Sequence, residues 1–145
     1  MPDLVPLPQH ALPGLLDGSV LPGVYRWCPE RPAAAVSDAQ QWAAESGWHA
    51  AALRLHDVHS KDAFLERCAV DLALPSWFGR NWDALADCLT DLSWWGEASG
   101  YLLLADPWAQ FERAAPQAAT TAVDVFVTAT DHWAARQVPM AVLLT

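Results

Sequence analysis

The chain has 145 residues, 53% of them hydrophobic and 17% charged, a balance that is typical of one compact globular domain. The same numbers argue against extended disorder, because disordered chains have few hydrophobic residues and many charged ones. Eight Lys and Arg stand against seventeen Asp and Glu, which gives a formal net charge of -9. Such a surface repels phosphate backbones and attracts cationic partners, so we expect no direct binding to nucleic acid.

The sequence has no feature of a secreted or membrane protein. The stretch Met1–Pro6 has no basic region, and no run of about 18 apolar residues occurs in the chain. We therefore expect a cytoplasmic protein that makes no contact with a membrane. Cys28, Cys68 and Cys88 form no Cys-x-x-Cys pair, and we interpret them as reduced thiols that serve as small core residues.

The first third of the chain is interrupted by proline and glycine. Residues 4–8 and 11–14 are too interrupted for regular structure, so we expect irregular chain there. Residues 20–28 have the composition of a strand, but a Pro-Gly pair within this segment favours the edge of a sheet over its centre.

Two helices have recognisable start signals. Ser37 and Gln40 match a capping box, which predicts a short helix from Ser37 to about Glu45, ended by Gly47. Ser60 is expected to cap a second helix, in which the apolar residues recur at helical spacing: Phe64, Leu65, Cys68 and Leu72.

Three short apolar runs, at residues 50–55, 101–105 and 140–144, are typical of strands buried on both faces of a sheet. Helical patterns follow Pro107 and span residues 116–135. Strands that alternate with helices in this way predict an α/β fold with a parallel sheet and right-handed crossovers.

A further helix, capped by Asn81, is expected over residues 82–92. At about 100° per residue, Asp83, Asp87 and Asp91 form one row on the helix surface. Like charges at this spacing cost about 0.2–0.5 kcal/mol per pair, so the row is unfavourable for stability and suggests an external partner. The apolar residues fall in a stripe on the opposite side: Trp82, Leu85, Leu89 and Leu92.

Other interpretations of this acidic row remain open. It could be a merely solvated face, or a site for a divalent cation, although one exposed helical row lacks the converging ligands of such a site. Trp77 and Phe78 precede the helix, and Trp94 and Trp95 follow it. Aromatic residues around charged ones are typical of protein interfaces, which favours a protein partner.

The segment Leu74–Thr90 has two aromatic residues and a glycine, followed by an Asn-x-Asp-Ala-Leu-x-Asp-Cys-Leu-Thr run. It resembles the signature of the barstar family of intracellular ribonuclease inhibitors, and a looser resemblance covers residues 48–145. The resemblance implies a barstar-like α/β fold, a small parallel β-sheet flanked by helices. Residues 1–47 are then an N-terminal extension. We expect it to pack on residues 48–145 through one edge strand and one short helix, or to make a second contact.

The resemblance also implies a role for individual residues. In the barstar family a helix and its preceding loop enter the active-site cleft of a barnase-like ribonuclease, and no chemistry is performed. Asp87 is similar to the central aspartate that takes the place of an RNA phosphate, and Asp83 to a second acidic contact. Trp77 matches an aromatic residue that packs on the nuclease, while Asn81 and Thr90 match neighbouring polar contacts.

The chain departs from the best-known family member at three other positions. Ala86 stands where that member has an interface Trp, Asp91 replaces a Gly, and Thr128 falls at an acidic contact. These differences are consistent with a different ribonuclease or a related basic toxin as the target. We include Asp91 and Trp94 among the expected partner-binding residues.

Two other classes of function compete with inhibition. A metal-dependent hydrolase would use His56 and His59, which lie three positions apart around Asp57, but the helix and Glu of a zincin are missing. An adaptor on the same scaffold would dock another basic protein with its acidic face. We expect an inhibitor that is no enzyme, needs no cofactor or metal ion, and is monomeric when free.

Overall fold

The computed structural model describes residues 4–145, and within this range every side chain except that of Gln9. Residues 1–3, part of the N-terminal stretch considered above, lie outside the described residues. Five parallel strands form one sheet in the order β1-β2-β5-β4-β3, which confirms the expected α/β fold. The strands are β1 (Val5–Leu7), β2 (Val24–Trp27), β3 (His49–Arg54), β4 (Tyr101–Asp106) and β5 (Met140–Leu144).

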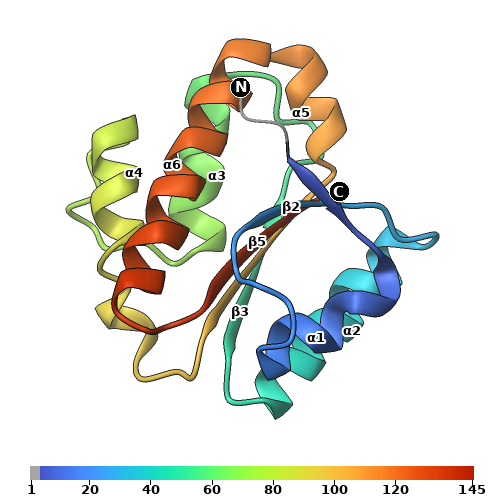
Figure 1. Ribbon diagram of the computed structural model, residues 1–145. Coiled ribbons are helices and arrows are strands. Elements are labelled where there is room, and N and C mark those ends of the chain that lie inside the picture. The colour runs from blue at the N-terminus through green and yellow to red at the C-terminus, as the bar shows by residue number, and fades with distance from the viewer. Residues whose placement is uncertain (1–3) are drawn as a thin grey trace.

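Helices cover both faces of this sheet (Figure 1). The helices are α1 (Leu12–Asp17), α2 (Pro32–Glu45), α3 (Lys61–Asp71), α4 (Trp82–Leu89), α5 (Trp108–Ala114) and α6 (Pro116–Ala135), with short 3-10 turns η1 (Gln9–Ala11) and η2 (Ser93–Trp95). Helices α1 and α2 lie on one side of the sheet and α3 to α6 on the other (Figure 1).

Two hydrophobic cores therefore lie on opposite faces of the sheet. Because side chains alternate along a strand, Leu103 and Ala105 of β4 belong to the core under α3 to α6. Leu102 and Leu104 belong to the core under α1 and α2, to which β1 and β2 contribute Leu7 and Trp27. The N-terminal residues thus supply most of one layer of the fold.

The expected burial of the three apolar strands holds for β4 and β5. All five residues of β5 and the first five of β4 are buried, because both strands lie inside the sheet. Strand β3 is only partly buried since it forms one edge of the sheet.

The prediction of irregular chain at residues 4–8 and 11–14 is wrong. Strand β1 pairs with β2, with Val5 opposite Tyr25. A strand of this length is not stable by itself, and its pairing with β2 stabilises it. Pro6 is tolerated there because β1 is an edge strand. Helix α1 accommodates Pro13 in its first turn, where a backbone N–H is not needed.

The prediction of an edge position for residues 20–28 is also wrong. Strand β2 spans only Val24–Trp27, so the Pro-Gly pair precedes it, and β1 covers its outer side. The described part of the extension therefore adds two strands and two α-helices to the fold, more than the one of each expected from the sequence.

Helix α2 begins earlier than the capping-box pattern predicted. It starts at Pro32, which occupies the first turn, and Ser37 lies inside the helix. The buried face of α2 explains the earlier start, because Ala35 packs in the same core as Ala39 and Ala43. The end at Glu45 was predicted correctly, and Gly47 follows with a positive φ of 81°.

Other predictions from the sequence are confirmed. The Ser60 hydroxyl accepts a hydrogen bond from the Ala63 N–H at 3.1 Å and caps α3. The four apolar residues of its helical pattern are all buried: Phe64, Leu65, Cys68 and Leu72. Cys68 and Cys88 are buried as expected, but Cys28, which directly follows the last residue of β2, is exposed, so its prediction as a core residue is wrong.

Candidate protein-binding surface

Helix α4 is short and strongly amphipathic, and it packs beside α6 (Figure 1). Leu85, Cys88 and Leu89 are buried on the inner side of the helix. Asp83 and Asp87 are exposed on the opposite side, one turn apart. We call α4 with these two carboxylates the acidic helix.

The start of the acidic helix is fixed by its cap. The Asn81 side-chain oxygen accepts a hydrogen bond from the Ala84 N–H at 2.8 Å, as the sequence predicted. The Asn81 amide nitrogen also donates to the Gly79 carbonyl at 3.4 Å, which ties the cap to the preceding loop. Asp83 lies in the first turn, where the partial positive charge of the helix end favours a carboxylate.

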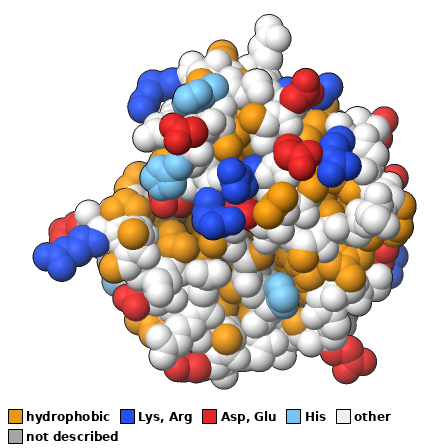
Figure 2. All heavy atoms as spheres, turned by 180° about the vertical axis from the view of Figure 1, so that it is seen from behind, with side chains coloured by type: hydrophobic (Ala, Val, Ile, Leu, Met, Phe, Trp, Pro, Cys, Tyr) orange, Lys and Arg blue, Asp and Glu red, His pale blue; other side chains and the backbone are white. Residues whose placement is uncertain are grey.

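The Asp83 and Asp87 carboxylates have no hydrogen-bond or ion-pair partner among the residues that the structure describes. Some other acidic groups are paired: Arg80 Nε lies 2.6 Å from a Glu66 carboxylate oxygen and holds the pKa of that carboxyl below its usual value. Figure 2 likewise shows basic side chains next to acidic ones on the face opposite to the view of Figure 1. The two free carboxylates of α4 are therefore available to an external cation.

Asp91 does not lie on the helix, contrary to the prediction of a helix over residues 82–92. The helix ends at Leu89, and Leu92 adopts the left-handed conformation with φ of 54°. The Asp91 carboxylate accepts a hydrogen bond from the Ser93 N–H at 3.3 Å, a local turn contact typical of Asp. The three carboxylates therefore do not form one continuous row on a helix. Two of them lie on α4, and the third is exposed in the turn that follows.

Two side chains secure the C-terminal end of α4. The Thr90 hydroxyl donates at 2.9 Å to the Ala86 carbonyl, which also accepts the Thr90 backbone N–H at 3.1 Å. The Trp133 indole N–H, from α6, donates to the Leu89 carbonyl at 2.8 Å. These contacts stop the helix before Asp91 and hold its end against α6.

Aromatic side chains lie at both ends of the acidic helix. Trp77, in the preceding loop, is 60% exposed, and its ring meets that of Trp94 edge to face at 6.2 Å. Trp95 has a structural role, because its N–H donates to the Leu72 carbonyl at 2.9 Å and its ring stacks on His49 at 4.2 Å. Trp94, but not Trp95, therefore extends the surface around Trp77.

Cys88 lies on the inner side of the acidic helix. Burial raises the pKa of its thiol to about 11, and the negative charges of Asp87 and Asp91 add to this effect. The thiol is therefore protonated at neutral pH and is a poor nucleophile.

Acidic residues on α6 were not identified from the sequence. Thr128 is exposed, and Asp124 and Asp131 lie on the same outer side of the helix at positions four before and three after it. The i, i+4, i+7 spacing of these three residues was the signal that could have revealed them. Because α6 packs against α4, the negative surface extends beyond the acidic helix.

The residues of the competing hydrolase interpretation are not brought together. His56 and His59 are both exposed. Among the described residues, no group of three or more His, Cys, Asp or Glu side chains could hold a metal ion. Within residues 4–145, none of the helices combines the length and the apolar character needed to cross a lipid bilayer.

The fold and this surface define a small α/β protein that exposes an acidic helix between aromatic side chains. Comparison with family models matches residues 48–145 to barstar, described as the barnase inhibitor, and the chain belongs to this family. The match begins one residue before β3 and includes the acidic helix, while β1, β2, α1 and α2 precede it. No curated protein matches the chain in a sequence comparison.

Proposed function

We propose that this protein inhibits a barnase-type ribonuclease, or a related basic toxin, by covering its active site with the acidic helix. The main support is that Asp83 and Asp87, in the part of the chain that matches the barstar family, are exposed and have no partner among residues 4–145. Charged groups left free on a protein of net charge -9 are suited to a cationic cleft.

In this mechanism Asp87 occupies the place of an RNA phosphate. A carboxylate accepts bidentate, charge-assisted hydrogen bonds from guanidinium groups, as a phosphate does, so it competes for the same Arg and Lys side chains. Asp83, one turn earlier, makes a second contact of the same kind. The inhibitor blocks the cleft without taking part in catalysis.

Neighbouring residues position and extend this contact. Asn81 and Thr90 hold the two ends of α4 through their side-chain bonds, and each keeps hydrogen-bonding capacity for the partner. Trp77 offers exposed aromatic area, a common source of binding energy at interfaces. Asp91 and Trp94 lie at the margin, where we expect contacts that distinguish one nuclease from another.

The proposal also gives a biological setting. An inhibitor of this kind acts as an immunity protein or antitoxin, in the cytoplasm of the cell that must survive the nuclease. Electrostatic attraction between the acidic inhibitor and its basic target speeds their association at low salt. We expect the free protein to be a monomer that binds no nucleic acid and no membrane.

The decisive experiment measures cleavage of a fluorescent RNA by a purified barnase-type ribonuclease with increasing amounts of the protein. We expect complete inhibition at one inhibitor per nuclease. Full activity in a large excess of folded protein would exclude this class of target. Recovery of only a regulatory protein by affinity purification would then favour the adaptor interpretation.

The Asp87→Ala variant tests the mechanism. We expect it to lose about 2–5 kcal/mol of binding free energy, the range for truncating one member of a buried charge pair, drawn in part from complexes of this family. Asp83→Ala should lose less, because that carboxylate makes the second contact.

Titration calorimetry with the inhibited nuclease measures these losses. Asp38→Ala is the matched control, since it removes an exposed carboxylate from α2 on the opposite side of the sheet. Unchanged binding of both α4 variants would contradict the proposed mechanism even if the protein still inhibits the enzyme.

A further inference from the structure

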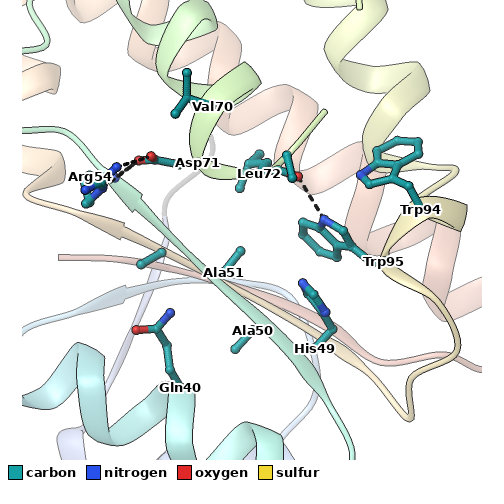
Figure 3. Close-up of a pocket in the computed structure, with 12 residues that line it drawn as sticks. Gln40, His49, Ala50, Ala51, Arg54, Val70, Asp71, Leu72, Trp94 and Trp95 are labelled. Atoms are coloured by element: carbon teal, nitrogen blue, oxygen red, sulfur yellow. Dashed lines mark hydrogen bonds and ion pairs between the residues drawn. The ribbon is translucent and has the colours of Figure 1, made fainter. Parts of the chain in front are cut away.

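Strand β3 has an open edge. Among the described strands it is the last of the sheet and pairs with β4 alone, so its outer side faces a groove of about 780 Å³ (Figure 3). The groove is bounded by α2 below and by the end of α3 and η2 above in the view of Figure 3. We call this space the edge groove; its lining includes Gln40, Ala50, Ala52, Leu72 and Trp95.

The backbone along the edge groove has free donors and acceptors. The His49 and Leu55 N–H groups donate toward β4, to the Gly100 and Asp106 carbonyls at 3.0 and 2.8 Å. Because backbone groups alternate in direction along a strand, the N–H and carbonyl groups of Ala50 and Ala52 point outward.

The bond at the end of β3 agrees with this alternation. The Arg54 N–H also points outward, where the Asp71 carboxylate accepts it at 2.8 Å. Asp71 thus closes the edge at Arg54, and the outward groups of Ala50 and Ala52 remain for another strand.

The shape of the edge groove permits a close approach. Ala50, Ala51 and Ala52 have the smallest side chains that a strand can have short of glycine, so a second backbone meets little obstruction at the usual strand spacing of about 4.8 Å. Figure 3 shows Gln40 on one side of the strand and Val70 and Leu72 on the other. Val70 is 59% exposed and presents an apolar wall.

The two ends of the edge groove differ in chemistry. At the start of β3, His49 stacks on Trp95, and Trp94 lies beside them (Figure 3). The Trp94 indole nitrogen is buried and has no hydrogen-bond partner among the described residues. This end therefore offers aromatic area.

The other end of the edge groove is cationic. Arg54 and Arg67 lie 2.8 and 3.9 Å from the same carboxylate oxygen of Asp71, whose side chain is only 2% exposed. Two guanidinium groups share one carboxylate, which leaves an excess positive charge beside the strand. The Arg54 side chain is 67% exposed and can reach a second carboxylate.

We propose that β3 binds an extended segment of a partner polypeptide as an added sixth strand. The segment places an aromatic or branched apolar side chain against the His49–Trp95 stack and a carboxylate beside Arg54. Backbone bonds to Ala50 and Ala52 provide the register, as in other cases of strand addition. This surface excludes the Asp83 and Asp87 carboxylates, meets the proposed nuclease contact at Trp94, and does not depend on nuclease inhibition.

A single extended segment fits this site better than a second copy of the protein. The open edge of β3 is recessed between α2 and the end of α3, so two such edges cannot meet without contact between their flanking helices (Figure 3). Two copies of net charge -9 also repel each other. A peptide strand has no flanking helices and matches the local positive charge.

The experiment uses the full chain and the capped peptide Glu-Thr-Val-Thr-Val-Trp, together with the same residues in reverse order. The two orders allow antiparallel and parallel addition. We expect one of them to bind, and binding to slow deuterium exchange at the Ala50 and Ala52 amides, measured by NMR. The Ala51 and Leu53 amides, which face β4, should exchange slowly with or without peptide.

Two substitutions separate strand addition from nonspecific binding. Ala52→Pro removes an outward N–H and spares the β4 ladder, so we expect about tenfold weaker binding, while Ala52→Val, which keeps the donor, retains binding. Replacing the peptide Glu by Gln should weaken binding about threefold in the native protein and not at all in Arg54→Ala. Asp87→Ala should bind the peptide normally.

The proposal is overturned if neither peptide binds at about 1 mM, a concentration that detects even weak complexes. It is also overturned if bound peptide leaves the Ala50 and Ala52 exchange rates unchanged, or if Ala52→Pro binds as well as Ala52→Val. Protection of these amides that rises with protein concentration alone would assign the edge to a second copy instead.

Discussion

The Asp83 and Asp87 carboxylates differ from several other acidic groups of the protein in having no hydrogen-bond or ion-pair partner among the described residues. Asp71 is buried against two arginines and Glu66 is paired with Arg80, so those carboxylates have a structural role. A free carboxylate on a helix gains little stability from its own protein. The difference supports a role for Asp83 and Asp87 in contact with another molecule.

His49 should give the protein a measurable loss of stability in mild acid. Its burial lowers the pKa of the imidazole, so the folded state favours the neutral ring. As the pH falls below about 6.5, the unfolded chain takes up this proton first, and the free energy of unfolding decreases until the pH passes the folded-state pKa. Urea unfolding between about pH 7.5 and 5 measures the effect.

The matched variant is His49→Phe, which keeps a ring against Trp95 but cannot take up a proton. Its free energy of unfolding should decrease less than that of the native protein over this pH range. Parallel pH profiles for the two proteins would show that His49 is not responsible. The other described histidines are present in both proteins and cancel in the comparison.

At the scale of elements, the cap of α4 links stability to binding. Asn81→Ala should cost about 1 kcal/mol of unfolding free energy, because the Ala84 N–H loses its acceptor. It should also weaken inhibition, since the first turn of α4 positions Asp83. Asn81→Asp keeps a capping oxygen and should restore most of the stability in urea unfolding.

Ser60→Ala is the control for this prediction. It removes the equivalent cap from α3 and should cause a similar loss of stability. Because α3 does not bear the proposed contact residues, nuclease inhibition should be retained. Equal loss of inhibition in both variants would indicate that reduced stability alone explains the Asn81→Ala effect.

The elements that the sequence predicted well are those defined by local interactions. The starts of α3 and α4 depend on Ser60 and Asn81, which bond to N–H groups three residues later. Strands β4 and β5 were recognisable because burial on both faces requires continuous apolar residues. The sequence also placed Asp83 and Asp87 correctly on the exposed side of α4, because the helical repeat alone sets which side of a helix a residue occupies.

The elements that the sequence missed depend on distant parts of the chain. Strand β1 forms because β2 lies beside it, and the end of α4 depends on Trp133, which is 44 positions away from Leu89. The roles of Trp94 and Trp95 likewise require the positions of Trp77, His49 and Leu72. No window of local sequence contains these contacts.

At the scale of the whole molecule, residues 1–47 should be needed for a stable fold. A chain that begins at Trp48 would expose the face of β4 and β5 now covered by α1 and α2, including Leu102, Leu104 and Leu143. We therefore expect it to lose cooperative thermal unfolding and to bind the hydrophobic dye ANS. The division of the chain at residue 47 stays a prediction from the sequence. On this expectation, the two parts do not fold independently.

Circular dichroism during heating and ANS fluorescence measure these changes. The matched control is Asp38→Ala, which changes an exposed side chain of α2 in the same layer, keeps the sheet face covered, and should unfold like the full protein. A chain from Trp48 that melts cooperatively at the same temperature and binds no ANS would show that the second layer is dispensable. In that case the extension would have to be explained by binding alone.

The order of the strands also has a consequence for folding kinetics. Strand β5, the last in the sequence, lies between β2 and β4, and its pairing with β2 joins residue 24 to residue 142. Closing so long a loop has a large entropic cost before any contact compensates it, which slows folding. Strands β3 and β4 can pair early, whereas β1 and β2 have no place in the sheet until β5 is present. The strands of the N-terminal layer therefore come first in the sequence, but we expect them to join the sheet last during folding.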